Sequence, residues 1–331
     1  MLASLDKDKP ESSWLSLALI RKWDGTMELI ENYMPVGSLV GERYEVIGVL
    51  GSGGFSYVLR AHDRQEDRTV ALKVLDVLGL KQGRRYDELL ARFEREIELI
   101  EQLQHRNVLS IYGHGFHETP RIPYMVVEFL DGQDLGQYIR EHGGFSATRL
   151  WPMLFPMLDA LAMAHDRGII HKDLSPANLF LRDPGTSKET ICILDFGIAY
   201  WRSAAQRLTA QNKFLGTPRY IAPEYASRQV VSPAIDIYQM GLVLVELLVA
   251  KPVVRAKSNL AALYSHMNGN LQIPAKLVDT ELWPILQKAL SSEPEARHQH
   301  AREFAGELAS IDPDELPELS EDDETVKISL T

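Results

Sequence analysis

Cysteine is almost absent from this sequence, which contains a single one, Cys192. One thiol excludes a disulfide within the chain and a cysteine-rich metal site, and it fits a reducing compartment. Long apolar runs are also missing, because the best N-terminal candidate, residues 13–20, is much shorter than the roughly 20 residues of a membrane helix. We therefore expect a cytoplasmic protein that does not insert into a membrane.

Basic residues are fewer than acidic residues in this sequence. The chain has 35 Lys and Arg against 46 Asp and Glu, a net charge of −11, which argues against binding to nucleic acid or to an anionic membrane. Residues 311–331 hold eight of the acids and one lysine. With two prolines and little apolar content, residues 312–331 are predicted to form an acidic disordered tail. Ser320 and Thr325 lie among these acids, and a phosphorylated docking segment is the alternative.

The first 43 residues are predicted to form an N-terminal extension. Two β-compatible runs in SLALIRKWDGTMELIENY (residues 16–33) flank Asp24 and Gly25, a pair that favours tight hairpin turns. A β-hairpin is the prediction here, and a short helix is the alternative.

From residue 44 the pattern predicts an α+β chain. Strand-like runs surround one helix at about 86–104, whose apolar residues recur every three or four positions. Helices dominate after residue 131. Ser146 is a plausible N-cap for a helix reaching about residue 166, and residues 234–249 are apolar nearly all round, which indicates a buried helix. A short apolar strand is expected at 191–194.

Three short motifs in the first half are each weak alone. GSGGFS (51–56) is most simply a turn between strands, although glycines also let backbone N–H groups approach phosphate oxygens. Lys73 of VALK reads as a surface lysine or as a phosphate ligand, with Ala71 and Val58 lining an apolar slot. Glu96 pairs with Arg92 on a solvated helix face or points inward to Lys73.

Two motifs in the second half suggest metal-assisted chemistry. In HKDLSPANLF (171–180), Asp173 and Asn178 are five residues apart, and Asp195 of LDFG follows a short strand. Asn178 and Asp195 offer the oxygen ligands that Mg²⁺ prefers, which leaves Asp173 to receive a hydroxyl proton. By itself each aspartate reads as a cap or turn residue.

In this order, followed by APE at 222–224, the motifs closely resemble those of protein kinases over about residues 44–311. YMVVEFLDG and GTPRYIAPE look most like the Ser/Thr branch, particularly bacterial Ser/Thr kinases of eukaryotic type. The resemblance implies a bilobal kinase fold, with a small antiparallel β lobe at 44–130 and a mostly helical lobe at 131–311. It also implies transfer of the γ-phosphoryl group of ATP, with Mg²⁺ or Mn²⁺, to Ser/Thr hydroxyls of protein substrates and of the enzyme itself.

The resemblance assigns roles to individual residues. Its catalytic residues are Asp173, Lys73, Glu96, Asn178 and Asp195, of which Asn178 and Asp195 bind the metal. Its nucleotide-binding residues are Leu50, Gly51, Ser52, Gly53, Gly54, Phe55, Ser56, Val58, Ala71, Lys73, Glu128 and Leu130. The remaining roles are a gatekeeper at Val127, a substrate loop around Thr217, a Glu224–Arg297 pair, and an anchor for the catalytic loop at Asp236.

Three residues depart from the family pattern. Ser56 replaces a loop glycine, Lys172 replaces the arginine before the catalytic aspartate, and Ser175 replaces the lysine that neutralises the γ-phosphate. Lysine lacks the bidentate fork of arginine, so dependence on phosphorylation at Ser203 or Thr209 is expected to be weak. A nucleotide-binding pseudokinase scaffold and a small-molecule kinase of kinase-like fold are the alternatives to a protein kinase.

Overall fold

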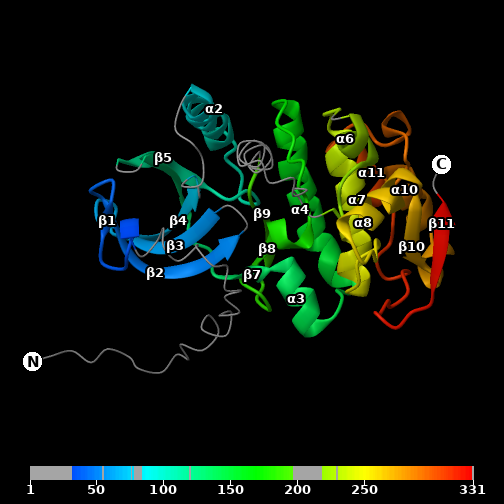
Figure 1. Ribbon diagram of the computed structural model, residues 1–331. Helices are drawn as coiled ribbons and strands as arrows, with labels where there is room; N and C mark the ends of the chain where they lie inside the picture. The colour runs from blue at the N-terminus through cyan, green and yellow to red at the C-terminus, as the bar shows by residue number, and fades with distance from the viewer. Residues whose placement is uncertain are drawn as a thin grey trace, which may run out of the picture. The chain divides into compact units, whose positions relative to one another are not determined.

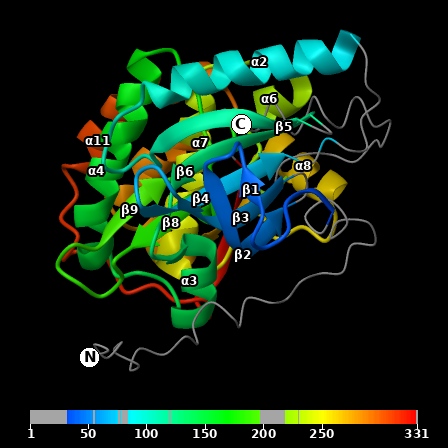
Figure 2. The ribbon, with the colours of Figure 1, turned by 90° about the vertical axis from the view of Figure 1, so that its left-hand side faces the viewer.

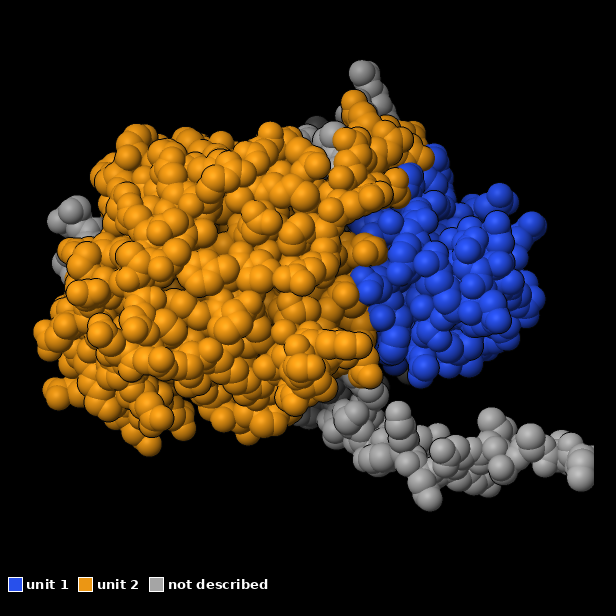
Figure 3. Space-filling view, turned by 180° about the vertical axis from the view of Figure 1, so that it is seen from behind, with its two compact units in different colours: residues 1–81, 111–129 blue, residues 82–110, 130–331 orange. Residues whose placement is uncertain are grey.

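The computed structural model describes residues 32–53, 56–75, 77, 84–118, 121–196, 218–228 and 230–329. Two compact units divide the chain (Figure 3): unit 1 comprises Met1–Lys81 and Ile111–Phe129, and unit 2 comprises Gln82–Ser110 and Leu130–Thr331. Residues 1–31, which include most of the predicted N-terminal hairpin, lie outside the described residues.

Unit 1 is built on a six-stranded antiparallel sheet in the order β1-β2-β3-β4-β6-β5, which forms one curved layer (Figure 2). In β3, buried positions from Tyr57 onward alternate with more exposed ones, so one face of that strand is buried. The apolar residues of β4 and β6, inside the sheet, are buried on both faces. The bounds of the six strands are β1 Leu39–Val40, β2 Tyr44–Gly53, β3 Ser56–Asp63, β4 Arg68–Leu75, β5 Ile111–Glu118 and β6 Arg121–Glu128.

Unit 2 is mostly helical (Figure 1). Its helices are α2 Arg84–Glu101, α3 Leu135–His142, α4 Ala147–Asp166, α6 Pro223–Arg228, α7 Ala234–Val249, α8 Asn259–Met267, α9 Ala275–Val278, α10 Leu282–Ala289 and α11 Ala301–Leu308, with 3₁₀ turns η2 Pro176–Asn178 and η3 Pro294–Ala296. The predicted N-cap of α4 is confirmed, since Ser146 Oγ accepts the Arg149 N–H at 3.4 Å.

Helix α7 is the core of unit 2. All sixteen of its residues are buried, as its apolar character on every face predicted. Helices α10 and α11 pack against it, and a Cβ on Gly241 of α7 would approach Leu290 within 3.0 Å. The few polar side chains on α7 are therefore buried as well, and each needs a hydrogen-bonding partner.

A three-stranded sheet, β7-β8-β9, completes the centre of unit 2. Its strands are β7 Gly132–Asp134, β8 Leu179–Arg182 and β9 Thr190–Ile193. The loop after α2 is joined to this sheet, because Asn107 Nδ2 donates to Ile191 O at 2.6 Å and Ile193 N–H donates to Asn107 O at 2.7 Å. This attachment explains why residues 82–110 group with unit 2, whereas the sequence predicted a small lobe running from 44 to 130.

The acidic tail is not disordered throughout, and that prediction is wrong for residues 325–329. Strand β11, Thr325–Ser329, pairs antiparallel with β10, Asn270–Pro274, from Pro274↔Thr325 to Asn270↔Ser329. Lys276 Nζ lies 2.6 Å from the Asp323 carboxylate. The sequence TVKIS has β-branched residues at three of its five positions, which favours a strand once β10 offers an edge to pair with.

The α+β architecture, with an antiparallel sheet and a helical unit, agrees with the fold class expected from the sequence. Within the described ranges, no helix combines the length and hydropathy of a membrane span.

Candidate active site

In unit 1 the predicted nucleotide-binding residues share one face of the sheet. Val58 pairs with Lys73 across β3 and β4, and Ala71 pairs with Val127 across β4 and β6. Residues paired across antiparallel strands lie on the same face, as do residues two apart on one strand. Val58, Ala71, Lys73 and Val127 therefore form one surface, and all except Val58 are buried. An apolar slot with a single cation at one end suits a purine and its phosphates.

The glycine motif runs from the end of β2 to the start of β3. Gly51 pairs with Val58 and Gly53 pairs with Ser56, and a register shift between Val49 and Gly51 places Leu50 in a bulge. Ser52 also lies on β2, opposite Tyr57. Gly54 and Phe55, at the tip, lie outside the described residues.

Lys73 is 6% exposed, which is rare for a lysine unless an anion compensates its charge. The sequence assigned this role to Glu96. Glu96 lies on α2, but its side chain lies outside what the structure describes, so the pairing stays a prediction. Of the other nucleotide contacts, Glu128 ends β6, and Leu130 is the first residue of unit 2 after that strand.

In unit 2, α7 holds the backbone of the predicted catalytic loop, residues 171–180. The Asp236 carboxylate is fully buried and accepts the His171 N–H and the Lys172 N–H, each at 2.8 Å. This confirms the anchoring role expected for Asp236. One turn along the helix, Gln239 Oε1 accepts the Leu174 N–H at 2.9 Å, and its Nε2 donates to Lys172 O at 3.1 Å. Residues 171–174 are thus fixed at four backbone groups.

A third donor reaches Asp236 from α4. His165 Nε2 lies 2.9 Å from Asp236 Oδ2, and the other ring nitrogen, Nδ1, accepts the Ala301 N–H at 3.4 Å. An Nδ1 that accepts leaves the proton on Nε2, so His165 donates to the carboxylate. Burial alone would raise the pKa of Asp236, but the hydrogen bond from His165 and the other donors hold it below its ordinary value. Asp236 is therefore ionised at neutral pH.

The proposed catalytic and metal-binding residues converge at one end of the β8–β9 pair. Asn178 immediately precedes β8 and Asp195 lies just after β9, and these strands pair through Leu179 and Ile193. Asn178 Nδ2 donates to Asp173 O at 2.5 Å and lies 3.3 Å from Asp173 Oδ2. The Leu194 N–H donates to Asn178 O at 2.9 Å. The structure thus gathers three residues that the sequence had grouped only by motif order.

His171 links the catalytic loop to the LDFG motif. Its Nδ1 accepts the Asp173 N–H at 3.3 Å, and its Nε2 lies 2.6 Å from Leu194 O. The ring also packs edge-on against Phe196, with centroids 4.9 Å apart. Because one nitrogen accepts and the other donates, a neutral imidazole satisfies both contacts.

Two non-glycine residues in this region adopt left-handed backbone conformations. Lys172 has φ 68° and Asp195 has φ 59°, a region that costs side-chain-bearing residues of order 1 kcal/mol or more. At Lys172 the two hydrogen bonds from α7 stabilise the conformation. Such strain is found where a fold must hold a side chain in one orientation, which is the requirement on the neighbouring Asp173.

Ser175 is 3% exposed and accepts the Asn178 N–H through its backbone carbonyl at 3.0 Å. It caps η2 from an extended conformation without a side-chain hydrogen bond. The residue therefore serves the local turn, and its hydroxyl supplies no positive charge where a lysine is usual. Ser56, the other small replacement, is buried at the start of β3.

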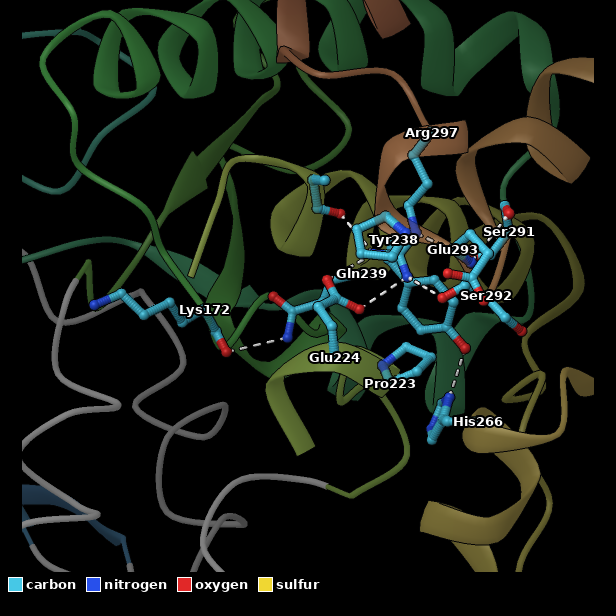
Figure 4. A network of polar contacts seen from close by, with 12 residues as sticks. Lys172, Pro223, Glu224, Tyr238, Gln239, His266, Ser291, Ser292, Glu293 and Arg297 are labelled. Atoms are coloured by element: carbon cyan, nitrogen blue, oxygen red, sulfur yellow. Dashed lines mark hydrogen bonds and ion pairs between the residues drawn. The ribbon is translucent and has the colours of Figure 1, made fainter. Parts of the chain in front are cut away.

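The predicted Glu224–Arg297 pair is confirmed (Figure 4). Arg297 donates Nη1 and Nη2 to the two Glu224 oxygens at 2.8 and 2.9 Å, and both side chains are buried. The guanidinium also donates to the carbonyls of Ser291, Ser292 and Ala234. Because Glu224 belongs to α6, this bidentate pair ties the segment after the 197–217 region to the core. Thr217, Ser203 and Thr209 lie outside the described residues.

Residues 44–321 match the family model of the protein kinase domain. The chain belongs to the protein kinase family. Among its solved structural neighbours is the kinase domain of Mycobacterium tuberculosis PknI, with a TM-score of 0.62 and 24% identity, covering 84% of this chain and 99% of that one. This likeness shows the kinase fold.

Several curated relatives of this kinase come from bacteria. Serine/threonine-protein kinase PknB of Mycobacterium tuberculosis is 30% identical over 304 residues, 89% of this chain and 47% of that protein. The probable PknB of Corynebacterium glutamicum is 31% identical over 284 residues, 82% of this chain and 43% of that protein. A probable serine/threonine-protein kinase of Streptomyces coelicolor is 34% identical over 272 residues, covering 80% and 39%. This kinase spans less than half the length of these relatives.

Protein kinases use ATP and a divalent cation, and the residues present fit a cation. Since the Asn178 amide nitrogen is directed at Asp173, its Oδ1 is the atom left to bind a metal, at the same strand end as Asp195. Across the described ranges, no group of three or more His, Cys, Asp or Glu side chains could hold a metal ion. An amide and a carboxylate, completed by phosphate and water oxygens, suit a divalent cation that prefers oxygen ligands.

Sequence reasoning missed His165 and Gln239, which support the catalytic loop of this kinase. Gln239 carried a signal, because it is a polar residue on a helix that is otherwise apolar nearly all round and lies three residues after Asp236. His165 carried none in the sequence. Its partners, Asp236 and Ala301, are 71 and 136 residues away.

Proposed function

We propose that this protein is an active Ser/Thr protein kinase that transfers the γ-phosphoryl group of ATP to Ser or Thr hydroxyls of proteins, and that it autophosphorylates. The observation that carries the proposal is the catalytic loop, in which α7 and Asn178 hold Asp173 in place. Because ATP is the proposed donor, we place the reaction in the cytoplasm.

In this proposal one set of residues binds the nucleotide. Lys73 binds the α- and β-phosphates, paired with Glu96, and the surface of Val58 and Ala71 contacts adenine. The backbone of Leu50, Gly51, Ser52, Gly53, Gly54, Phe55 and Ser56 covers the phosphates, and Glu128 and Leu130 offer backbone groups to the base. These contacts orient the γ-phosphate and do not change covalently during the reaction.

In unit 2, Asn178 and Asp195 hold Mg²⁺, for which Mn²⁺ is the closest substitute. The cation neutralises phosphate charge when it is bound. Asp173 accepts a hydrogen bond from the substrate hydroxyl, orients its oxygen toward the γ-phosphorus and takes up the proton. Protein kinases carry out little covalent chemistry of their own, so holding the Asp173 side chain in a fixed position and orientation contributes directly to the rate.

The test is phosphoryl transfer to a generic protein substrate and to the kinase itself, by wild type and by Asp173→Asn. Removing a group that accepts the proton typically costs 10²–10⁴-fold in rate, so the variant is expected to lose at least about 100-fold in kcat. Asp183→Asn is the matched control, because Asp183 is exposed on the turn after β8, and it is expected to keep wild-type activity.

The same experiment separates the alternatives. Equal phosphate incorporation by wild type and Asp173→Asn would contradict the role of Asp173. Nucleotide binding by the wild type without any turnover would identify a pseudokinase, the reading that Ser175 favours. Phosphate that appears on a metabolite and never on protein would identify a small-molecule kinase.

A further inference from the structure

Two exposed arginines of unit 2, Arg140 and Arg219, are not used by the proposed mechanism. Arg140 lies near the end of α3, the helix that packs against η2 of the catalytic loop. The ideal Cβ position at Gly136, one turn earlier, lies 3.4 Å from Arg140 Nη1 and 3.5 Å from the backbone nitrogen of Ala177. The guanidinium of Arg140 therefore lies beside the turn that contains Asn178.

The second arginine, Arg219, comes from the segment after the 197–217 region. It precedes Tyr220, whose hydroxyl donates to Glu246 Oε2 on α7 at 2.6 Å. Both Arg219 and Arg140 act electrostatically on this Tyr220–Glu246 pair, and each favours the charged forms of the tyrosine and the carboxylate. The two arginines thus act on one buried pair from two different segments of the chain.

The carboxylates near these arginines are already engaged. Glu246 is 7% exposed and bonded to Tyr220, and burial raises its pKa, so it is a weak counter-ion. Asp134 accepts the Gln137 N–H at 2.8 Å and interacts electrostatically with Arg140, but burial raises its pKa, so it too is a weak counter-ion. Glu141 accepts from the Gln137 side chain at 2.8 Å. In the described part of the chain, neither arginine makes a salt bridge, and both side chains face solvent.

We propose that Arg140 and Arg219 bind an anionic residue, a carboxylate or a phosphate, that flanks the acceptor hydroxyl in the protein substrate. The inference rests on the proposed function. A hydroxyl presented to Asp173 brings its neighbouring residues past η2, beside which Arg140 lies, and Arg219 acts on the same buried Tyr220–Glu246 pair as Arg140. Guanidinium groups match carboxylates and phosphates through two parallel hydrogen bonds, so the pair selects acidic or phosphorylated substrates over basic ones.

The experiment compares peptides that are identical except at one position flanking the acceptor serine. That position is Ala, Asp, phosphoserine or Arg, and it is scanned along both sides of the acceptor. Each peptide is assayed for kcat and KM with wild type, with Arg140→Gln/Arg219→Gln and with Arg140→Glu/Arg219→Glu. Arg106→Gln is the control, because Arg106 is an exposed arginine in the loop after α2.

With two partly exposed charges, wild type is expected to show a KM about 5- to 10-fold lower for the anionic peptide than for the alanine peptide at the same position. The Asp and phosphoserine arms identify whether carboxylate or phosphate is preferred. The glutamine variant loses this preference, the glutamate variant inverts it toward the arginine peptide, and Arg106→Gln keeps it.

Four results would overturn the inference. Turnover without preference by wild type defeats it while leaving the proposed function intact. A preference that survives the glutamate variant assigns recognition to other residues. An equal change in kcat or KM on every peptide, together with a raised KM for ATP, would mean that the arginines contact the nucleotide and not the peptide. No phosphate on any peptide or on the kinase itself defeats the proposed function, and the inference with it.

Discussion

Replacing Asp236 by Asn is expected to destabilise the protein and to slow phosphoryl transfer, although the side chain keeps its shape. Three donors converge on this fully buried carboxylate: His165 Nε2 and the His171 N–H on Oδ2, and the Lys172 N–H on Oδ1. An asparagine has one acceptor oxygen. If its NH₂ group takes the place of Oδ2, it faces two of these donors, and if it takes the place of Oδ1, it faces one.

The amide is expected to turn its nitrogen toward Lys172, since this leaves one donor rather than two without an acceptor. A buried donor left unsatisfied costs about 1–3 kcal/mol, and exchanging a charged acceptor for a neutral one weakens each remaining bond by about 1 kcal/mol. The free energy of unfolding is therefore expected to fall by about 3–5 kcal/mol, a large share of the roughly 5–15 kcal/mol of a typical domain.

The activity should fall as well, because the N–H left without an acceptor belongs to Lys172, whose left-handed backbone precedes Asp173. Urea unfolding and kcat on a protein substrate measure the two effects. Asp159→Asn is the control, since Asp159 is 75% exposed on α4. An Asp236→Asn variant with the same unfolding midpoint and kcat as Asp159→Asn would refute the claim that this carboxylate organises the catalytic loop.

Two further predictions follow from the network in Figure 4. Arg297→Ala leaves the buried Glu224 carboxylate without its partner and is expected to lower the free energy of unfolding by about 3–5 kcal/mol, whereas Arg302→Ala, on an exposed pair with Asp166, should cost under about 1 kcal/mol; similar urea midpoints for both would contradict this. Burial lowers the pKa of His266, which lies 2.8 Å from the Tyr238 hydroxyl, to about 4. In the unfolded chain the pKa is about 6.5, so the unfolded state binds the extra proton and stability falls as pH drops from about 6.5 to about 4, by about 3 kcal/mol in total. Urea unfolding from pH 7 to pH 4 should show this component in wild type and not in His266→Gln; a difference between the two proteins that does not change with pH would exclude it.

Periodicity predicted the elements of this kinase well where burial is uniform along a segment. The apolar stretch at 234–249 became α7 with those bounds, and Ser146 caps α4. It did worse where pairing with a distant strand decides the outcome. TVKIS near the C-terminus was assigned to a disordered tail because its neighbours are acidic, but β10, about 50 residues earlier, supplies an edge and Lys276 offsets part of the charge.

The sequence alone determined the family and predicted the roles within it, because spacing and residue type survive without coordinates: a glycine turn, a strand lysine, an Asp–Asn loop and DFG in one order. Only the tertiary structure decided how the catalytic loop is held. The buried carboxylate of Asp236 collects donors from α4 and from residues 171 and 172, and Arg297 reaches Glu224 across 73 residues. Hydrogen bonds between segments so far apart leave no periodic trace in the sequence, because burial, which makes them strong and obligatory, is a property of the folded chain.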